Sequence, residues 1–149
     1  MKIRKNDIFL YGRKMLFQML EILYPRRCAV CDEIEVTGKG ICPLCKDKVH
    51  VAGEPACKKC GKPLMDERKE FCTDCGKKHH VYTQGKAVFV YEGGIRNSMY
   101  RFKYGNKREY AEFYANAAVE KYGVWLNKIK AEVLIPIPMY SRKKRLRGY

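Results

Sequence analysis

The chain has 149 residues, eight cysteines, and a net charge of +15 from 31 basic and 16 acidic side chains. An apolar content of 46% argues against global disorder, and the length allows one ordinary domain, or a small module with part of a larger one. No apolar run is long enough to cross a bilayer and no export signal with a cleavage site is present, which excludes a transmembrane protein and a secretory precursor. We expect a cytoplasmic protein, or one that is peripheral at the inner face of the membrane.

Residues 1–25 are predicted to form an N-terminal helix. Asp7 can cap it, and Pro25 ends it. The apolar positions that recur at helical spacing are Leu16, Met19, Leu20 and Leu23. The expected role of this helix is packing against a core, with a helix on a membrane surface as the alternative.

Residues 26–80 contain all eight cysteines, in four Cys-x-x-Cys turns. A turn of this kind points two thiolates at one ion, and two turns complete the tetrahedron that structural zinc prefers. Without an export signal, the reducing cytosol favours metal over disulfides. The pattern predicts a double zinc ribbon that holds two structural zinc ions in closed sites. The predicted ligands are Cys28, Cys31, Cys42, Cys45, Cys57, Cys60, Cys72 and Cys75.

The two halves of this region are offset by 29 or 30 residues, which indicates a duplicated ribbon. Gly61 and Gly76 follow their cysteines, where a tight turn favours glycine. Sequential pairing of the turns is preferred, because a cross-brace of the first turn with the third must close a longer loop. A thioredoxin-like redox pair and an iron–sulfur cluster are weaker alternatives. A redox pair needs one Cys-x-x-Cys in a βαβ setting, and the close-packed cysteine spacing of bacterial ferredoxins is absent. The ligands need no histidine, although the pair His79-His80 could replace one cysteine.

The positive charge lies mainly outside the ribbons. Residues 1–27 carry +5, residues 28–80 carry +1, and residues 81–149 carry +9. Eight thiolates and two divalent ions would lower the charge of the ribbon region to −3. Any phosphate binding is therefore expected in the N-terminal arm or after residue 80, and should weaken with salt.

Residues 81–149 are predicted to form part of an α/β domain with the order strand, helix, helix, strand. The first strand is residues 87–91, and the last strand, residues 131–137, is expected to be buried on both faces. The first helix is residues 95–104 and ends at a left-handed Gly105. The second helix is residues 108–122 and ends at Gly123. Two strands are too few to cover their apolar faces, so the sequence is expected to be cut within a domain.

Two stretches of this region are candidates for binding phosphate or nucleic acid. The alternation of aromatic and basic residues from Tyr100 to Tyr104 is similar to a base-stacking platform, although an amphipathic helix explains most of it. A basic loop follows the last strand, where ligands of open α/β sheets gather, with a disordered basic tail as the alternative. The candidate binding residues are Arg96, Arg101, Lys103, Arg142, Arg145, Arg147 and Gly148.

The sequence resembles the ComF competence proteins, which join a double zinc ribbon to a phosphoribosyltransferase-like domain. The motifs that match in order are Leu23 to Cys28, the four Cys-x-x-Cys turns, Tyr91-Glu92-Gly93, Phe102-Lys103-Tyr104 with Asn106, and Ile135 to Pro138 followed by Arg142, Arg145 and Arg147 to Tyr149. Tyr140 and Ser141 depart from the His-Pro often found in the family.

The resemblance implies a role in natural transformation, beside a helicase that helps to pull single-stranded DNA into the cytoplasm. It also implies binding of phosphoribosyl pyrophosphate with magnesium if the domain is completed. The Asp-Asp-x-x-Thr-Thr-Gly segment that holds this ligand is absent from these 149 residues, so the chain alone is not expected to transfer a phosphoribosyl group.

The fold class predicted overall is a small zinc-ribbon module with two four-cysteine sites, followed by the incomplete first half of an α/β phosphoribosyltransferase-like domain. The predicted boundaries are residues 1–25, 26–80 and 81–149. Two other hypotheses remain: a non-enzymatic zinc-ribbon adaptor that binds single-stranded nucleic acid, and a truncation product that folds no further than the ribbons.

Overall fold

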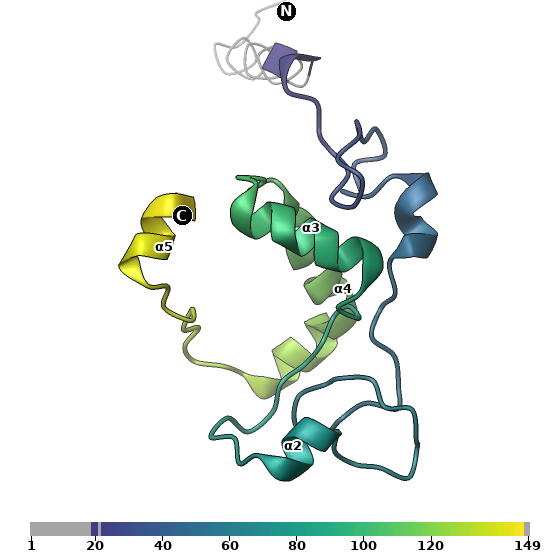
Figure 1. Ribbon diagram of the computed structural model, residues 1–149, viewed down its shortest axis with the longest axis vertical. Helices are drawn as coiled ribbons and strands as arrows, with labels where there is room; N and C mark the ends of the chain where they lie inside the picture. Colours follow the sequence, from purple (N-terminus) through teal and green to yellow (C-terminus); the bar gives the residue numbers. More distant parts are fainter. Residues whose placement is uncertain (1–18, 21, 148–149) are drawn as a thin grey trace, which may run out of the picture.

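The computed structural model describes residues 19–20 and 22–147. Its elements in chain order are η1 (Pro43–Lys48), α2 (Thr73–Lys77), α3 (Gly93–Tyr104), α4 (Tyr110–Ile129) and α5 (Ser141–Arg147). Figure 1 shows α3 and α4 at the centre, with the earlier cysteine turns beside α3. The later turns, with α2, lie at the end of the molecule away from the N-terminus. We call residues 26–48 the first ribbon and residues 55–77 the second ribbon.

The predicted N-terminal helix lies mostly outside the described residues. Positions 19–20 and 22–23 are helical, and their side chains are exposed. The sequence pattern predicts that this helix packs against a core, but the described end of the helix does not. None of the described helices is long and apolar enough to cross a membrane.

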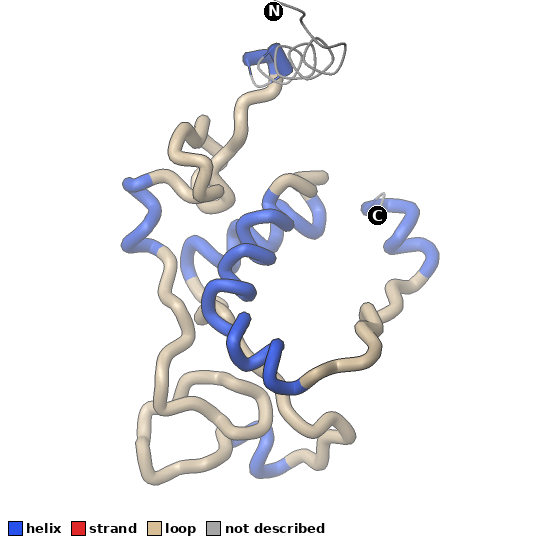
Figure 2. Tube along the Cα trace, turned by 180° about the vertical axis from the view of Figure 1, so that it is seen from behind, coloured by secondary structure: helices blue, strands red, loops and turns tan. Residues whose placement is uncertain are grey.

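Extended backbone is paired only at isolated positions within residues 19–20 and 22–147, and Figure 2 accordingly draws no strand there. The predicted strand at residues 87–91 is wrong in extent. Only Phe89 forms a bridge, with Val51, and two backbone hydrogen bonds flank it, from Ala52 N to Val88 O (2.9 Å) and from Val90 N to His50 O (2.8 Å). The pairing stays short because the chain turns into α3 almost at once.

The predicted buried strand at residues 131–137 is also wrong. This segment has no regular structure, and its apolar side chains are exposed, Leu134 at 88%. A strand needs a neighbour for its N–H and C=O groups, and no described segment lies paired with this one. The α/β sheet expected in residues 81–149 is therefore not present in the described part of the chain.

The two central helices follow the sequence prediction except at their ends. Helix α3 ends at Tyr104, but Gly105 is not left-handed (φ −99°), and Asn106 takes that conformation instead (φ 55°). Helix α4 runs through Gly123 to Ile129 and ends at a left-handed Lys130 (φ 46°). A glycine within a helix costs about 1 kcal/mol, which is too little to end α4 at Gly123.

The main hydrophobic core joins the first ribbon to α3 and α4. Its buried members are Ala29 from the ribbon, Ile95 from α3, and Tyr110 and Phe113 from α4. Partly buried side chains pack around them, namely Ile41, Val49, Phe89, Phe102 and Tyr114. The first ribbon is thus one layer of the core and not an appendage.

Candidate metal centres

The cysteines of the first ribbon form a compact cluster of four sulfur atoms. The Sγ atoms of Cys28, Cys31, Cys42 and Cys45 all lie within 4.8 Å of one another. The Sγ atoms of Cys31 and Cys42 are 3.7 Å apart. Four thiolates around one zinc at about 2.3 Å would be separated by about 3.8 Å, so the cluster has the size and the donor set of a structural zinc site.

The second ribbon repeats this arrangement. The Sγ atoms of Cys57, Cys60, Cys72 and Cys75 also lie within 4.8 Å of one another, and those of Cys60 and Cys72 are 3.8 Å apart. All eight cysteines are free thiols. The turns are therefore grouped sequentially, first with second and third with fourth, and the cross-brace is wrong. Two structural zinc ions fit these two clusters.

The backbone of the two ribbons shows the duplication. Cys28 N donates to Glu33 O and Cys57 N donates to Lys62 O, both at 2.8 Å. The bridges also correspond, between residues 27 and 34 in one ribbon and 56 and 63 in the other. Gly61 has the positive φ expected of it (75°), whereas Gly76 lies inside α2 without one.

Asp32 holds the position in the first ribbon that Gly61 holds in the second, and it has the same left-handed backbone (φ 69°). Its carboxylate accepts a hydrogen bond from the Tyr110 hydroxyl (2.6 Å) and forms an ion pair with Lys107 (2.8 Å). These donors outweigh the effect of burial and lower the pKa of Asp32 below its usual value. Asp32 therefore joins the first metal centre to the central helices.

Backbone N–H groups stabilise one thiolate in each cluster. Val30 N and Cys42 N lie 3.4 and 3.3 Å from Cys28 Sγ. Burial opposes ionisation of Cys28, but these donors prevail and lower its pKa to about 7. Similar backbone donors lower the pKa of Cys57 to about 6. Burial and the adjacent sulfur atoms instead raise the pKa of Cys45 to about 12, so a bound cation is needed to hold all four sulfurs as thiolates.

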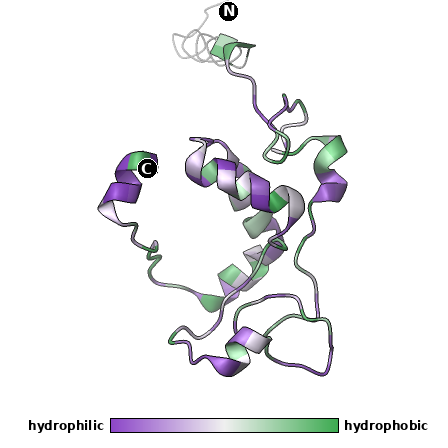
Figure 3. Ribbon diagram, viewed as in Figure 1, coloured by the Kyte–Doolittle hydropathy of each residue, from purple (hydrophilic) through white to green (hydrophobic). Residues whose placement is uncertain are grey.

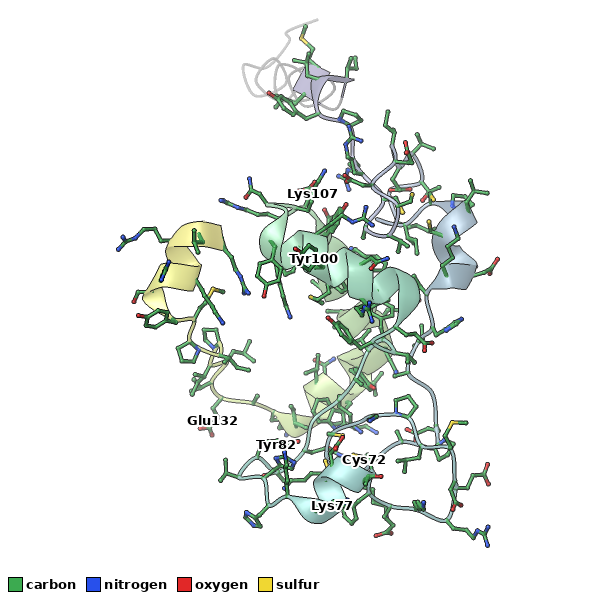
Figure 4. All side chains as sticks on the ribbon, viewed as in Figure 1. Cys72, Lys77, Tyr82, Tyr100, Lys107 and Glu132 are labelled. Carbon is green, nitrogen blue, oxygen red and sulfur yellow. The ribbon has the colours of Figure 1, made fainter. Side chains whose placement is uncertain are left out.

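The two centres have different surroundings. Cys28 and Cys45 belong to a buried cluster with Val30, and the Val30 carbonyl accepts a hydrogen bond from Arg101 of α3. Around the second centre the contacts are local, mainly with residues 84–87, as when Gly85 N donates to Lys59 O (2.6 Å). Figure 4 shows Cys72 near Tyr82 beside α2, remote from the labelled Tyr100 and Lys107.

The histidines take other contacts. His50 Nδ1 lies 2.7 Å from a carboxylate oxygen of Glu92, and the His80 ring stacks on Tyr82 at 5.2 Å. The groups of potential metal ligands in the described residues contain cysteines alone. The replacement of a cysteine by His79 or His80 is therefore wrong for this geometry.

The structure does not bring all the predicted phosphate-binding residues together. Arg96 is exposed and Lys103 partly exposed on α3, but Arg101 is turned toward the first ribbon, where it binds Val30 O. Arg142 and Arg145 are exposed on α5, so the basic run is a short helix and not the predicted loop. Gly148 lies outside the described residues.

Arg147 is the point at which α5 meets α3. Its guanidinium lies 5.1 Å from the centre of the Tyr104 ring, within the range of a cation–π contact. One guanidinium nitrogen also lies 3.7 Å from Met139 Sδ. Arg147 is therefore the predicted basic residue that links α5 to α3.

Sequence reasoning missed three polar residues that organise the structure. Asp32 was detectable by aligning the two repeats, because it replaces the glycine of the second ribbon. The buried Glu35 accepts hydrogen bonds from the loop at residues 37–40, including Gly40 N at 3.2 Å. Lys121 of α4 donates to three carbonyls around the bridge at Phe89, including Ala87 O at 3.0 Å. Neither Glu35 nor Lys121 lies in a recognisable sequence motif, so the sequence gives no indication of their roles.

Comparison with known proteins agrees with this geometry. A search among curated proteins and a search among solved structures found no match. Residues 19–76 match the double zinc ribbon domain family. The match covers both cysteine clusters and ends before α3, so the relationship of residues 81–149 to phosphoribosyltransferases stays a prediction. The chain therefore contains a double zinc ribbon domain at residues 19–76.

Proposed function

We propose that the chain is the zinc-ribbon portion of a ComF-like protein that acts in natural transformation. In this role the double ribbon is a docking scaffold, and the basic region after it handles single-stranded DNA as the DNA enters the cytoplasm. The observation that carries the proposal is the double zinc ribbon at residues 19–76, followed in order by the motifs that resemble the ComF family. The expected partner is the competence helicase.

The metal centres support a scaffold in preference to a catalyst. Four thiolates close the coordination of each zinc and leave no position for water or substrate. The second ribbon also exposes apolar side chains that the described residues do not cover, among them Met65 and Phe71. Exposed apolar side chains on a rigid, metal-stabilised loop suit a protein contact. We assign docking to the second ribbon, because the first ribbon is already packed on the central helices.

The proposal assigns no phosphoribosyl transfer to the described residues. The ribose and phosphate ligands of such enzymes would come from a segment that these 149 residues lack. Magnesium and phosphoribosyl pyrophosphate would bind only in a completed domain.

Disruption of the gene in a naturally transformable host tests this function. We expect transformation by linear DNA to fall, while DNA still binds at the cell surface. Complementation with the wild-type gene should restore transformation, and complementation with a Cys75→Ser variant, which breaks the docking ribbon, should restore little of it. Normal transformation in the disrupted strain would contradict the proposal.

A non-enzymatic adaptor that binds single-stranded nucleic acid outside competence is the second candidate. It is favoured by the net charge of +9 in residues 81–149. The two candidates differ in the disruption experiment, since the adaptor predicts normal transformation together with nucleic-acid binding by the purified protein.

A further inference from the structure

Two basic segments that contain no acidic residue meet at the C-terminal end of α3. Residues 93–108 and residues 133–147 each carry five basic side chains and no acidic one. Figure 1 shows α5 opposite the C-terminal turn of α3, and Figure 3 shows α5 hydrophilic over most of its length. The contact between Arg147 and the Tyr104 ring joins the two helices. The α5 cations carry no acidic counterpart within their own segment, and a polyanion at this contact would neutralise them.

The same place exposes two tyrosine rings. Tyr100 and Tyr104 lie one turn apart on α3, are 65% and 64% exposed, and have ring centroids 5.1 Å apart. The buried side of α3 is formed by other residues, Ile95 and Ser98, with Phe102 partly buried against the core. The sequence pattern allowed all these aromatics to be explained as core residues, but the structure uses only Phe102 in that way. Arg147 contacts the Tyr104 ring, and the exposed remainder of both tyrosines is open to a ligand.

We propose that Tyr100, Tyr104 and the cations of α5 form a binding surface for single-stranded nucleic acid. Bases stack on the tyrosine rings, and phosphates contact Arg142 and Arg145, which are exposed on α5. Stacking requires unpaired bases, which is why the ligand is a single strand and not a duplex. The proposal deepens the proposed function and relies on it only for the identity of the strand as DNA.

The structure also indicates which basic residues do not belong to this surface. Arg101 is held by the carbonyl of Val30, and Lys107 is paired with Asp32. Both bind within the protein and contribute little to phosphate contacts. The surface therefore extends from α3 toward α5 and not toward the first ribbon.

Fluorescence anisotropy with labelled oligothymidylate and the zinc-loaded full chain tests the proposal. The double variant Tyr100→Ala/Tyr104→Ala should lower affinity at least about fivefold for each base that stacks, with an unchanged salt dependence. A plot of log affinity against log salt concentration has a negative slope. The double variant Arg142→Ala/Arg145→Ala should make this slope less steep by about 1.4. The conservative variant Tyr100→Phe/Tyr104→Phe should bind like the wild type, because phenyl rings also stack.

Matched controls separate the surface from general effects of charge and folding. Tyr24→Ala/Tyr91→Ala removes two exposed tyrosines elsewhere, and Lys69→Ala/Lys128→Ala removes two exposed charges elsewhere. Both should bind nearly like the wild type. All variants should keep the zinc content and far-ultraviolet circular dichroism of the parent, because every substituted side chain is exposed.

The outcomes distinguish the stacking surface from the role in DNA uptake. Equal binding of duplex and single strand, or no effect of the tyrosine substitutions, would overturn the stacking surface. Preference for an RNA strand over the DNA strand, with loss in the tyrosine variant, would support the surface but contradict a role in DNA uptake. Preference for single-stranded DNA with the same loss would support both.

Discussion

The substitution Asp32→Gly tests whether the first metal centre and the central helices form one structural unit. In the wild type the Asp32 carboxylate accepts a hydrogen bond from the hydroxyl of Tyr110, a residue that is 1% exposed, and forms an ion pair with Lys107. Glycine is the residue that the second ribbon has at the equivalent position. The substitution therefore removes these links while keeping a backbone that tolerates the left-handed conformation.

The magnitude follows from the separate contributions. Glycine relieves about 1 kcal/mol of left-handed strain but adds a similar entropy loss on folding, so the backbone effects nearly cancel. Loss of the acceptor leaves the buried hydroxyl of Tyr110 unpaired, which costs about 1–3 kcal/mol. The pair with Lys107, whose side chains are only 25% and 27% exposed, adds about 1 kcal/mol or less. We expect the free energy of unfolding to fall by about 1–4 kcal/mol.

Urea denaturation of the zinc-loaded protein, followed by circular dichroism, measures this change. In a double-mutant cycle with Tyr110→Phe, the loss from both substitutions together should be smaller than the sum of the two single losses. Unchanged or higher stability of Asp32→Gly, or strictly additive losses, would refute the link between the ribbon and α4.

The pH dependence of this link follows from the two pKa shifts. The pKa of Asp32 is lowered, so its contribution to stability is present above the unfolded value of about 3.9 and is lost as the pH falls through the lower folded value. Burial and the Asp32 contact raise the pKa of Tyr110, which keeps its hydroxyl protonated. The coupling should therefore be constant between about pH 6 and 9. A coupling that changes within that range would contradict this assignment.

Three further predictions concern the two metal centres, the turns and α4. Cys45→Ser should disrupt the packing of α3 and α4, visible as loss of near-ultraviolet circular dichroism, whereas Cys75→Ser should lose one zinc and keep that packing; equal effects would contradict the difference between the centres. Gly61→Ala should lower thermal stability more than Gly38→Ala, because both have positive φ but only the first would place a methyl group 2.6 Å from a neighbouring backbone nitrogen; equal losses would count against that contact. Lys121→Met removes a charged donor from backbone carbonyls and should lower the free energy of unfolding, measured by urea denaturation, by about 1.5–3 kcal/mol. A loss no larger than that from substituting an exposed lysine would show that these hydrogen bonds contribute nothing.

The metal centres were predictable from the sequence because their chemistry depends on spacing alone. Two Cys-x-x-Cys turns supply the four thiolates that a structural zinc site needs, and loop closure favoured the sequential pairing that the structure has. The local turn at Gly61 was predictable for the same reason. The role of Asp32 was not, since it depends on the position of Tyr110, a residue distant in the sequence.

The errors arose where structure depends on neighbours beyond the local segment. The run Val133 to Ile135 has the composition of a buried strand, but composition does not supply the adjacent strand that its hydrogen bonds require. Gly123 has the pattern of a helix stop, but α4 continues through it, because a glycine inside a helix costs only about 1 kcal/mol. The spacing of Tyr100, Phe102 and Tyr104 did not distinguish the core ring from the two exposed ones.

The metal content of the purified chain tests the central claim most directly. Native mass spectrometry of protein prepared without chelators, together with elemental analysis, should show two zinc ions per chain and eight reduced cysteines. Iron in place of zinc, disulfide-linked cysteines, or a chain that remains folded with no bound metal would contradict the assignment of two structural zinc centres.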